Sequence, residues 1–243
     1  PEQLPWYEKV AKFVCDGLDE CGYIYCPGGI MAMTDEWRQP LANWQETVRK
    51  WARAPTPDAV MRVSIFFDIR CVHGDCALAD QLQETMLEQT SRNSIFLAAL
   101  CANALDSKPP LGIFRRFVVD RDGEHRRELD LKKRGVLPVT EIVRLHALAN
   151  KVAAVKTDER LKELAAQKHI TITNSRNLAD ALHFIQHLRI MHQCEQITRG
   201  EKVSNFLNPR DLPRLAKEQL RDAFTIIDEA QSSIKQTYRA GMG

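Results

Sequence analysis

Three segments of the sequence contain residue types that could bind an anionic substrate. In the first, Gly28 and Gly29 follow a short apolar run and precede Arg38. Glycine lets a backbone approach a ligand closely, and an arginine can hold a phosphate through two parallel hydrogen bonds. Taken alone, these residues are explained more simply by a turn into a loop that carries a surface arginine.

The second segment places charged residues inside an apolar stretch. Asp68 and Arg70 follow two phenylalanines, and His73 and Asp75 come a few residues later. An Asp and an Arg in such surroundings are costly unless they are paired or serve a function. The residues leave both interpretations open: a binding site, or ion pairs at buried helix ends.

The third segment is a run of three cations before an expected helix start. Lys132, Lys133 and Arg134 precede Gly135 and Pro138. Cationic side chains beside the free N–H groups of a helix start can bind phosphate. A solvated loop is the usual alternative, and the run alone favours it.

Several other motifs of catalysis and metal binding are missing. The sequence has no G-x-x-x-x-G-K-[ST], no G-x-G-x-x-G and no G-x-S-x-G. Asp120-x-Asp122-Gly123 has its glycine too early for a calcium loop and is more typical of a hairpin turn. His183 and His187 are four residues apart on an expected helix, but no third ligand is apparent. We therefore predict no metal site in this chain.

Composition excludes several classes of protein. The 243 residues are 44% hydrophobic and 27% charged with a net charge of +2, which does not favour a nucleic-acid partner. The longest nearly uncharged run, 94–105, is too short to span a bilayer, and the N-terminal residues lack an apolar signal segment. We expect a cytoplasmic protein without a membrane partner whose seven cysteines are reduced thiols.

The hydrophobic pattern predicts a mainly helical chain. Helices are expected at 6–18, from 41 to 51, from 57 to the stop at Gly74, from 75 to 86, from 93 to 105, and along most of the chain after Gly135. A strand is expected at 23–26, and a hairpin is expected to join 113–119 to 125–131. Residues 65–71 alternate like a strand, but the Thr56-Pro57 start signal favours a helix that carries Asp68 and Arg70.

These segments, in this order, resemble a bacterial family of nucleotidyltransferases that are often joined to CBS and cyclic-nucleotide-binding domains. The family is similar to the PII uridylyltransferases and the glutamine-synthetase adenylyltransferases. The resemblance covers nearly the whole chain. It rests on CGYIYCPGGIMA with EWR, SIFFDIRCVHGD, LDLKKRGVLPV, DALHFIQHLRIMHQ and LRDAFTIIDEAQ.

The resemblance implies a fold and a function. Residues 1–56 would be a small remnant of an α/β nucleotidyltransferase core, and 57–243 a helical substrate-binding bundle with a short β-hairpin. The whole protein would transfer a nucleotidyl group from an NTP to a protein or small acceptor in signalling. Lys132 and Lys133 would neutralise phosphate charge, while Asp68, Arg70 and His73 would orient the acceptor or nucleotide. The alternative is a non-catalytic helical module that docks a partner or a sensory domain.

One departure from the superfamily bears on catalysis. Its enzymes hold triphosphate on a Gly-Ser helix start and Mg²⁺ on a D-x-D strand end. This sequence has no Gly-Ser pair, and its only D-x-D is Asp120 to Asp122. In the family these motifs lie upstream of CGYIYCPGG, so we expect a fragment or a truncated gene product. The complete enzyme would use Mg²⁺, whereas this chain alone is expected to bind none and to show no nucleotidyl transfer.

Overall fold

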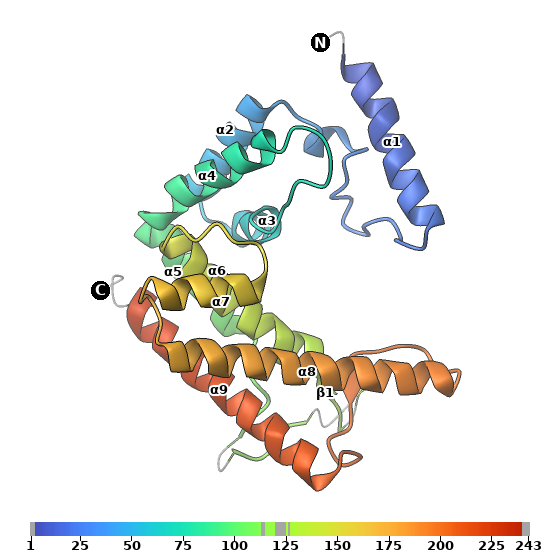
Figure 1. The fold of residues 1–243 in the computed structure, drawn as a ribbon, viewed down its shortest axis with the longest axis vertical. Coiled ribbons are helices and arrows are strands. Elements are labelled where there is room, and N and C mark those ends of the chain that lie inside the picture. Colours follow the sequence, from blue (N-terminus) through green and yellow to red (C-terminus); the bar gives the residue numbers. More distant parts are fainter. Residues whose placement is uncertain (1–2, 113–114, 120–124, 126, 240–243) are drawn as a thin grey trace. The chain divides into compact units, whose positions relative to one another are not determined.

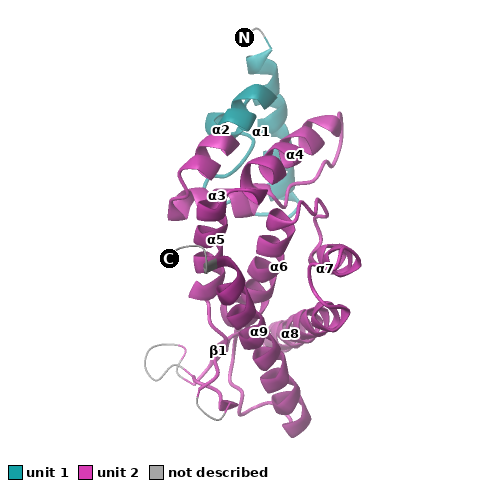
Figure 2. Cartoon of the chain, turned by 90° about the vertical axis from the view of Figure 1, so that its left-hand side faces the viewer, with its two compact units in different colours: residues 1–47 teal, residues 48–243 magenta. Residues whose placement is uncertain are grey.

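The computed structural model describes residues 3–112, 115–119, 125 and 127–239 (Figure 1). The chain divides into two compact units, residues 1–47 and 48–243 (Figure 2). Within the described residues it is mainly helical, as the sequence predicts. None of these helices combines the length and the apolar character that crossing a membrane requires.

The first unit is built around α1 (Leu4–Glu20), a 3₁₀ turn (Asp35–Trp37) and the start of α2 (Leu41–Arg53). The expected strand at 23–26 is wrong, because this segment is an irregular loop after α1. Side chains of α1 bind it: the Tyr25 hydroxyl lies 2.8 Å from Asp16 Oδ1, and the Tyr25 N–H donates to Asp19 Oδ1 at 3.2 Å. These bonds occupy a donor that a strand would need for a neighbouring strand.

The second unit contains the end of α2 and seven further α-helices within the part of the chain that is described. They are α3 (Pro57–Phe66), α4 (Ala77–Ser91), α5 (Ser94–Asp106), α6 (Leu137–Ala149), α7 (Thr157–Ala166), α8 (Ile172–Thr198) and α9 (Arg214–Arg239). The expected start signal at Thr56 is confirmed, because Thr56 Oγ1 accepts from Ala59 N at 3.2 Å. Asn93 caps α5 in the same way, and its Oδ1 accepts from Phe96 N at 3.0 Å.

The core of the second unit lies where α5, α6, α8 and α9 meet. Phe96 on α5, Leu145 on α6, Ile185 on α8 and Phe224 on α9 are fully buried there. A π-helical turn (Lys132–Val136) leads into α6, and its Gly135 packs against α8 and α9. The helices that carry polar side chains are therefore fixed by a continuous apolar core.

The sheet has two short strands. β1 (Leu129–Asp130) pairs antiparallel with β2 (Phe206–Leu207), and Leu129 lies opposite Leu207. The turn of the expected hairpin, 120–123, lies outside the described residues. Phe117 forms an isolated bridge with Leu111. The described partner of β1 is β2, which lies far along the chain, rather than the segment 113–119 that the hairpin prediction assigned to it.

The loop after α3 corrects two expectations. The helix ends at Phe66, so Asp68 and Arg70 lie in a loop and not on a helix that continues to Gly74. The N–H groups of Asp68 and Ile69 reach only the carbonyls three residues back, which is how a helix tightens at its end. The expectation of seven free thiols is also wrong, because Cys71 and Cys76 form a disulfide.

Candidate functional site

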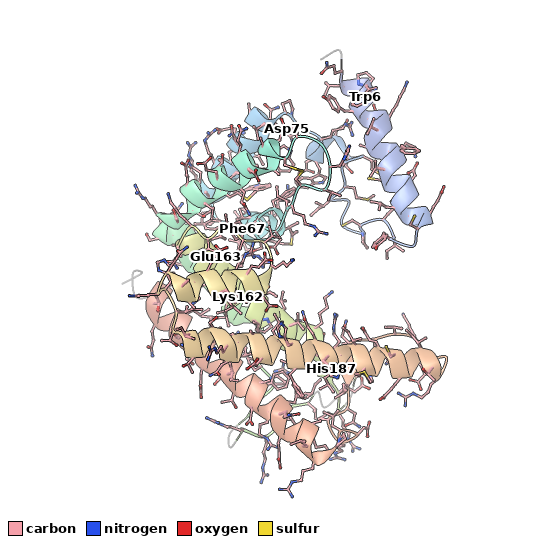
Figure 3. The ribbon with its side chains drawn as sticks, in the orientation of Figure 1. Trp6, Phe67, Asp75, Lys162, Glu163 and His187 are labelled. Atoms are coloured by element: carbon pink, nitrogen blue, oxygen red, sulfur yellow. A yellow bond between two sulfur atoms is a disulfide. The ribbon has the colours of Figure 1, made fainter. Side chains whose placement is uncertain are left out.

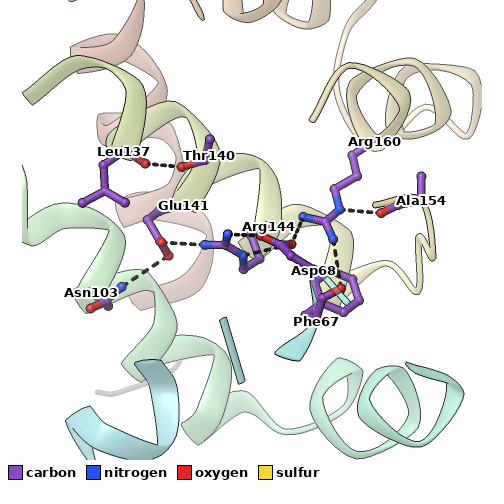
Figure 4. Close-up of polar contacts among 9 residues, drawn as sticks. All are labelled: Phe67, Asp68, Asn103, Leu137, Thr140, Glu141, Arg144, Ala154 and Arg160. Atoms are coloured by element: carbon purple, nitrogen blue, oxygen red, sulfur yellow. Dashed lines mark hydrogen bonds and ion pairs between the residues drawn. The ribbon is translucent and has the colours of Figure 1, made fainter. Parts of the chain in front are cut away.

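Asp68 lies between two arginines from different helices (Figure 4). Arg160 Nη1 of α7 donates to Asp68 Oδ1 at 2.7 Å, and Arg144 Nη2 of α6 donates to Asp68 Oδ2. Arg144 Nη1 also donates to Glu141 Oε1. Two guanidinium groups and two carboxylates thus balance in charge, which suits groups held in a low-dielectric interior.

Arg160 fastens the loop to its surroundings. Its Nε donates to the Ala154 carbonyl at 2.6 Å and its Nη2 to the Phe67 carbonyl at 3.3 Å. Its guanidinium carbon also lies 4.3 Å from the centre of the Phe67 ring. One side chain therefore holds the end of α3 and the segment before α7 in a fixed arrangement.

Within the ion-pair network, the pKa values of Arg144 and Arg160 shift in opposite directions. Burial acts to lower the pKa of Arg144, but Glu141 and Asp68 outweigh it and raise that pKa above its ordinary value. Burial lowers the pKa of Arg160, and the attraction of Asp68 opposes the change only in part. Both side chains act as cations in this network, because each guanidinium donates to a carboxylate and arginine is not deprotonated in proteins.

An open cleft of about 700 Å³ borders this network. We call it the Asp68 cleft. It is lined by Asp68, Arg70, residues 153–159, Leu182, His183 and Gln186. The structure therefore brings together two residues that the sequence singled out, Asp68 and Arg70, on one wall of a cavity.

The charged side chains of the Asp68 cleft differ in how they are paired. Lys156 Nζ contacts Glu159 Oε1 at 3.1 Å, and His183 Nε2 lies 2.8 Å from Asp158 Oδ2. Arg70 is exposed and makes no ion pair with any residue that the structure describes. Among the described residues it is therefore a cleft cation that no carboxylate holds, and its guanidinium can bind an anionic ligand through two hydrogen bonds.

His73 and Asp75 lie in the same loop but do not line the Asp68 cleft. Both are exposed. Asp75 Oδ1 accepts from Ala77 N at 3.1 Å, so it serves the start of α4 as the sequence predicts (Figure 3). Its described contact is that of a helix-capping residue.

Lys132 and Lys133 begin the π-helical turn before α6, and both are exposed. Their N–H groups donate to Asp130 Oδ1 at 3.0 and 2.8 Å, so the donors that the sequence suggested for phosphate are already bonded to a carboxylate. Lys133 precedes Arg144 by roughly 15 Å along the helix axis. Neither lysine is part of the lining of the Asp68 cleft.

Gly28, Gly29 and Arg38 belong to the first unit. Gly29 has a φ of +68°, which glycine adopts easily, and its N–H closes a turn on the Cys26 carbonyl. Arg38 pairs with Asp35, and its Nη1 donates to the Ala32 carbonyl at 3.0 Å. The guanidinium of Arg38 is thus bound within its own loop.

Sequence reasoning missed most of the polar side of the Asp68 cleft. His183 was considered only with His187, which lies one turn further along α8 (Figure 3). Its partner in the structure is Asp158, whose sequence signal was that of a helix start. Among the described residues no group of three or more His, Cys, Asp and Glu side chains could hold a metal. The described residues therefore do not fit a magnesium site.

A larger cavity of about 970 Å³ lies among α6, α7, α8 and α9 and contains none of the residues singled out as binding candidates. His146 and Tyr238 line it, with the Tyr238 hydroxyl 3.1 Å from His146 Nδ1. Burial, and then the charge of His169, lower the pKa of His146 to about 4. Burial raises the pKa of Tyr238 to about 12, so both groups are neutral at pH 7.

Comparison with protein families gives two matches. Residues 94–238 match the family described as "Putative nucleotidyltransferase substrate binding domain", and residues 1–58 match "Putative nucleotidyltransferase DUF294". No curated protein and no solved structure matches the chain. The chain therefore belongs to the DUF294 nucleotidyltransferase family, and residues 94–238 are the family's C-terminal substrate-binding domain.

Proposed function

We propose that residues 48–243 hold a phosphate-bearing substrate of a nucleotidyl transfer in the Asp68 cleft, with the anionic group on Arg70. The observation that carries this proposal is an exposed arginine without an ion pair among the described residues, on the wall of a cavity. The family match supports the part of the cleft formed by residues 153–159 and by side chains of α8, because both fall within the matched substrate-binding domain, 94–238.

The residues of the cleft have separate tasks in this proposal. Asp68 is ion-paired with Arg144 and Arg160, so it positions the loop and does not bind the ligand itself. Arg70 offers a bidentate hydrogen-bond donor to phosphate oxygens. Asp158 and His183 form a polar pair that can hydrogen-bond a hydroxyl of the nucleotide or acceptor. In the complete enzyme Mg²⁺ would neutralise charge on the transferred phosphate.

The identity of the substrates is part of the proposal. The ligand is an NTP or an acceptor, which is a protein or a small molecule, and the setting is bacterial signalling. The roles of His73, Lys132 and Lys133 remain those that the family resemblance implies. His73 would orient the substrate, and the two lysines would neutralise phosphate charge, although none of the three lines the Asp68 cleft.

Calorimetric titration of ATP at low salt tests the proposal. The wild-type chain should bind weakly, and Arg70→Ala should weaken binding roughly tenfold, in line with the loss of a charged hydrogen bond. Arg92→Ala is a matched control, because Arg92 is also exposed but lies outside the Asp68 cleft. Equal affinity of Arg70→Ala and wild type, with both folded, would remove the cleft from the proposal.

A docking role is the second candidate, and α1 favours it. Trp6 is 61% exposed and Phe13 is 79% exposed on this helix, where Cys15 alone among the described residues of α1 is buried. Large apolar side chains in such numbers mark an interaction surface. We propose that α1 packs against a catalytic, CBS or cyclic-nucleotide-binding domain. Phe13→Asp should then weaken association with such a domain supplied separately, and unchanged association would exclude α1.

A further inference from the structure

The disulfide between Cys71 and Cys76 closes a small ring in the loop that carries Arg70. The two Cα atoms are 5.2 Å apart, and four residues separate the cysteines. The other five cysteines are free thiols, including the exposed Cys21, Cys26 and Cys194. The protein thus forms one bond between particular cysteines and leaves other accessible thiols unpaired, which is typical of a redox site rather than of a disulfide framework.

The position of Cys76 favours reversible chemistry. Cys76 is exposed and is the residue immediately before α4, a helix of 15 residues. A thiolate that forms at a helix N-terminus lies at the positive end of the helix dipole, which stabilises it and makes it the better leaving group. Cys71 is half-buried and lies within the loop rather than at a helix start. The two sulfur atoms therefore differ in chemistry, and Cys76 Sγ is the one that leaves when the bond is reduced.

The reduction balances with a dithiol as the reductant. A thiolate of the dithiol attacks Cys71 Sγ, the S–S bond breaks, and its electron pair leaves on Cys76 Sγ, which takes up a proton. The second thiolate of the dithiol then attacks the dithiol sulfur that is bonded to Cys71 in the mixed disulfide. Cys71 Sγ leaves with the electron pair of that bond and also takes up a proton. Two electrons and two protons pass to the protein, and the dithiol becomes a disulfide.

The loop has few other restraints between its two ends. Asp68 is fixed by Arg144 and Arg160. Residues 70–74 donate no backbone hydrogen bond to any residue that the structure describes, and Val72 is 87% exposed. Arg70 therefore lies between an ion-pair anchor at Asp68 and a covalent anchor at Cys71. Reduction removes the second anchor and leaves the backbone of Arg70 free to sample more conformations.

We infer that Cys71 and Cys76 are a reversible thiol–disulfide switch that sets how firmly Arg70 is held at the Asp68 cleft. The oxidised form holds Arg70 in place, and the reduced form releases it. Preorganised side chains lose less entropy on binding, so the oxidised protein binds an anionic ligand more tightly. This consequence for ligand binding rests on the proposed function, whereas the redox reaction and the ordering of the loop do not.

The first test measures the bond and the loop without a ligand. The chain is equilibrated in dithiothreitol buffers of graded ratio, alkylated, and the peptide that contains residues 71–76 is weighed. Reversible conversion should occur at this peptide, and backbone ¹⁵N order parameters of 69–74 should fall on reduction. Irreversible conversion, or order parameters that do not change, would overturn the inference.

The second test measures ATP affinity in both redox states. The oxidised form should bind roughly threefold to tenfold more tightly than the reduced form. Cys71→Ser/Cys76→Ser should match the reduced form in either buffer, while Cys21→Ser/Cys26→Ser should keep the wild-type response. Equal affinity in both states would overturn the link to the cleft and leave the proposed function intact. No binding in either state would overturn the proposed function, and the first test would still decide the switch.

Discussion

Asp68 and Arg160 are 92 residues apart in the sequence and form an ion pair of 2.7 Å that joins the loop after α3 to α7. The Arg160 side chain is only 2% exposed, whereas that of Asp68 is 37% exposed. Removal of the carboxylate leaves two guanidinium groups close together without a shared partner. The loop and the segment before α7 depend on the same contact, so this pair fixes one wall of the Asp68 cleft.

The first prediction concerns this pair. Asp68→Asn should lower the free energy of unfolding by about 2 kcal/mol, less than for a fully buried pair because water reaches Asp68. Urea unfolding followed by circular dichroism measures it. Asp80→Asn on the exposed face of α4 is the control and should change stability by less than about 0.5 kcal/mol. A loss no larger for Asp68→Asn than for Asp80→Asn would contradict the role given to the pair.

The second prediction concerns Gly135 in the turn before α6. An added Cβ would lie 2.9 Å from Ile185 Cγ2 and 3.4 Å from Phe224 Cε1, both on fully buried side chains. Gly135→Ala should therefore destabilise the protein by about 1–3 kcal/mol. Gly17→Ala on α1 meets no atom within 4 Å and should be neutral or slightly stabilising. Thermal unfolding of the two variants gives the comparison, and equal effects would show that the turn tolerates the methyl group.

The third prediction concerns acid stability. The pKa of His146 is lowered to about 4 in the folded protein, below the ordinary value of 6.5, so the unfolded state binds more protons between these values. Stability should fall as the pH falls from about 6.5 to about 4, by about 2 kcal/mol between pH 7 and pH 5. His146→Gln should lose this part of the pH dependence, whereas His187→Gln should retain it. Identical slopes for all three proteins in urea titrations at the two pH values would refute the assignment.

The fourth prediction concerns the lysines before α6. Because Asp130 occupies the N–H groups of Lys132 and Lys133, only their ammonium groups can attract a nucleotide there. Lys132→Ala/Lys133→Ala should weaken ATP binding by less than Arg70→Ala does. The loss of affinity in the lysine variant relative to wild type should shrink as salt is added, because salt screens exposed charges. A larger loss for the lysine variant would make the turn before α6 the principal phosphate site.

The helical elements could be predicted because their signals are local. The Thr56 start signal and the apolar stripe of 6–18 predict helices that the structure contains. The end of α3 could not be predicted, because the preference of Asp68 for a loop depends on arginines that come 76 and 92 residues later. The strand expected at 23–26 failed for a related reason, since side chains of α1 bind the segment.

The candidate site was predictable only in part. Asp68 and Arg70 stood out because charge inside an apolar run is unusual, and both line one cleft in the structure. The sequence gives no comparable indication that Arg160 and Asp158 belong to a site. Both lie in α7, whose polar residues are typical of a helix exposed to solvent. The disulfide between Cys71 and Cys76 was not predicted, because seven cysteines in a sequence without an apolar signal segment indicate reduced thiols.

The most direct test of the account is to locate where a nucleotide binds. The chain is irradiated with 8-azido-ATP, and the labelled peptides are identified by mass spectrometry, with excess ATP as a competitor. We expect competed labels on peptides that contain residues 67–70, 153–159 or 182–186, and loss of those labels in Arg70→Ala. Competed labelling confined to residues 132–134, or to the cavity lined by His146 and Tyr238, would contradict the assignment of the Asp68 cleft as the substrate site.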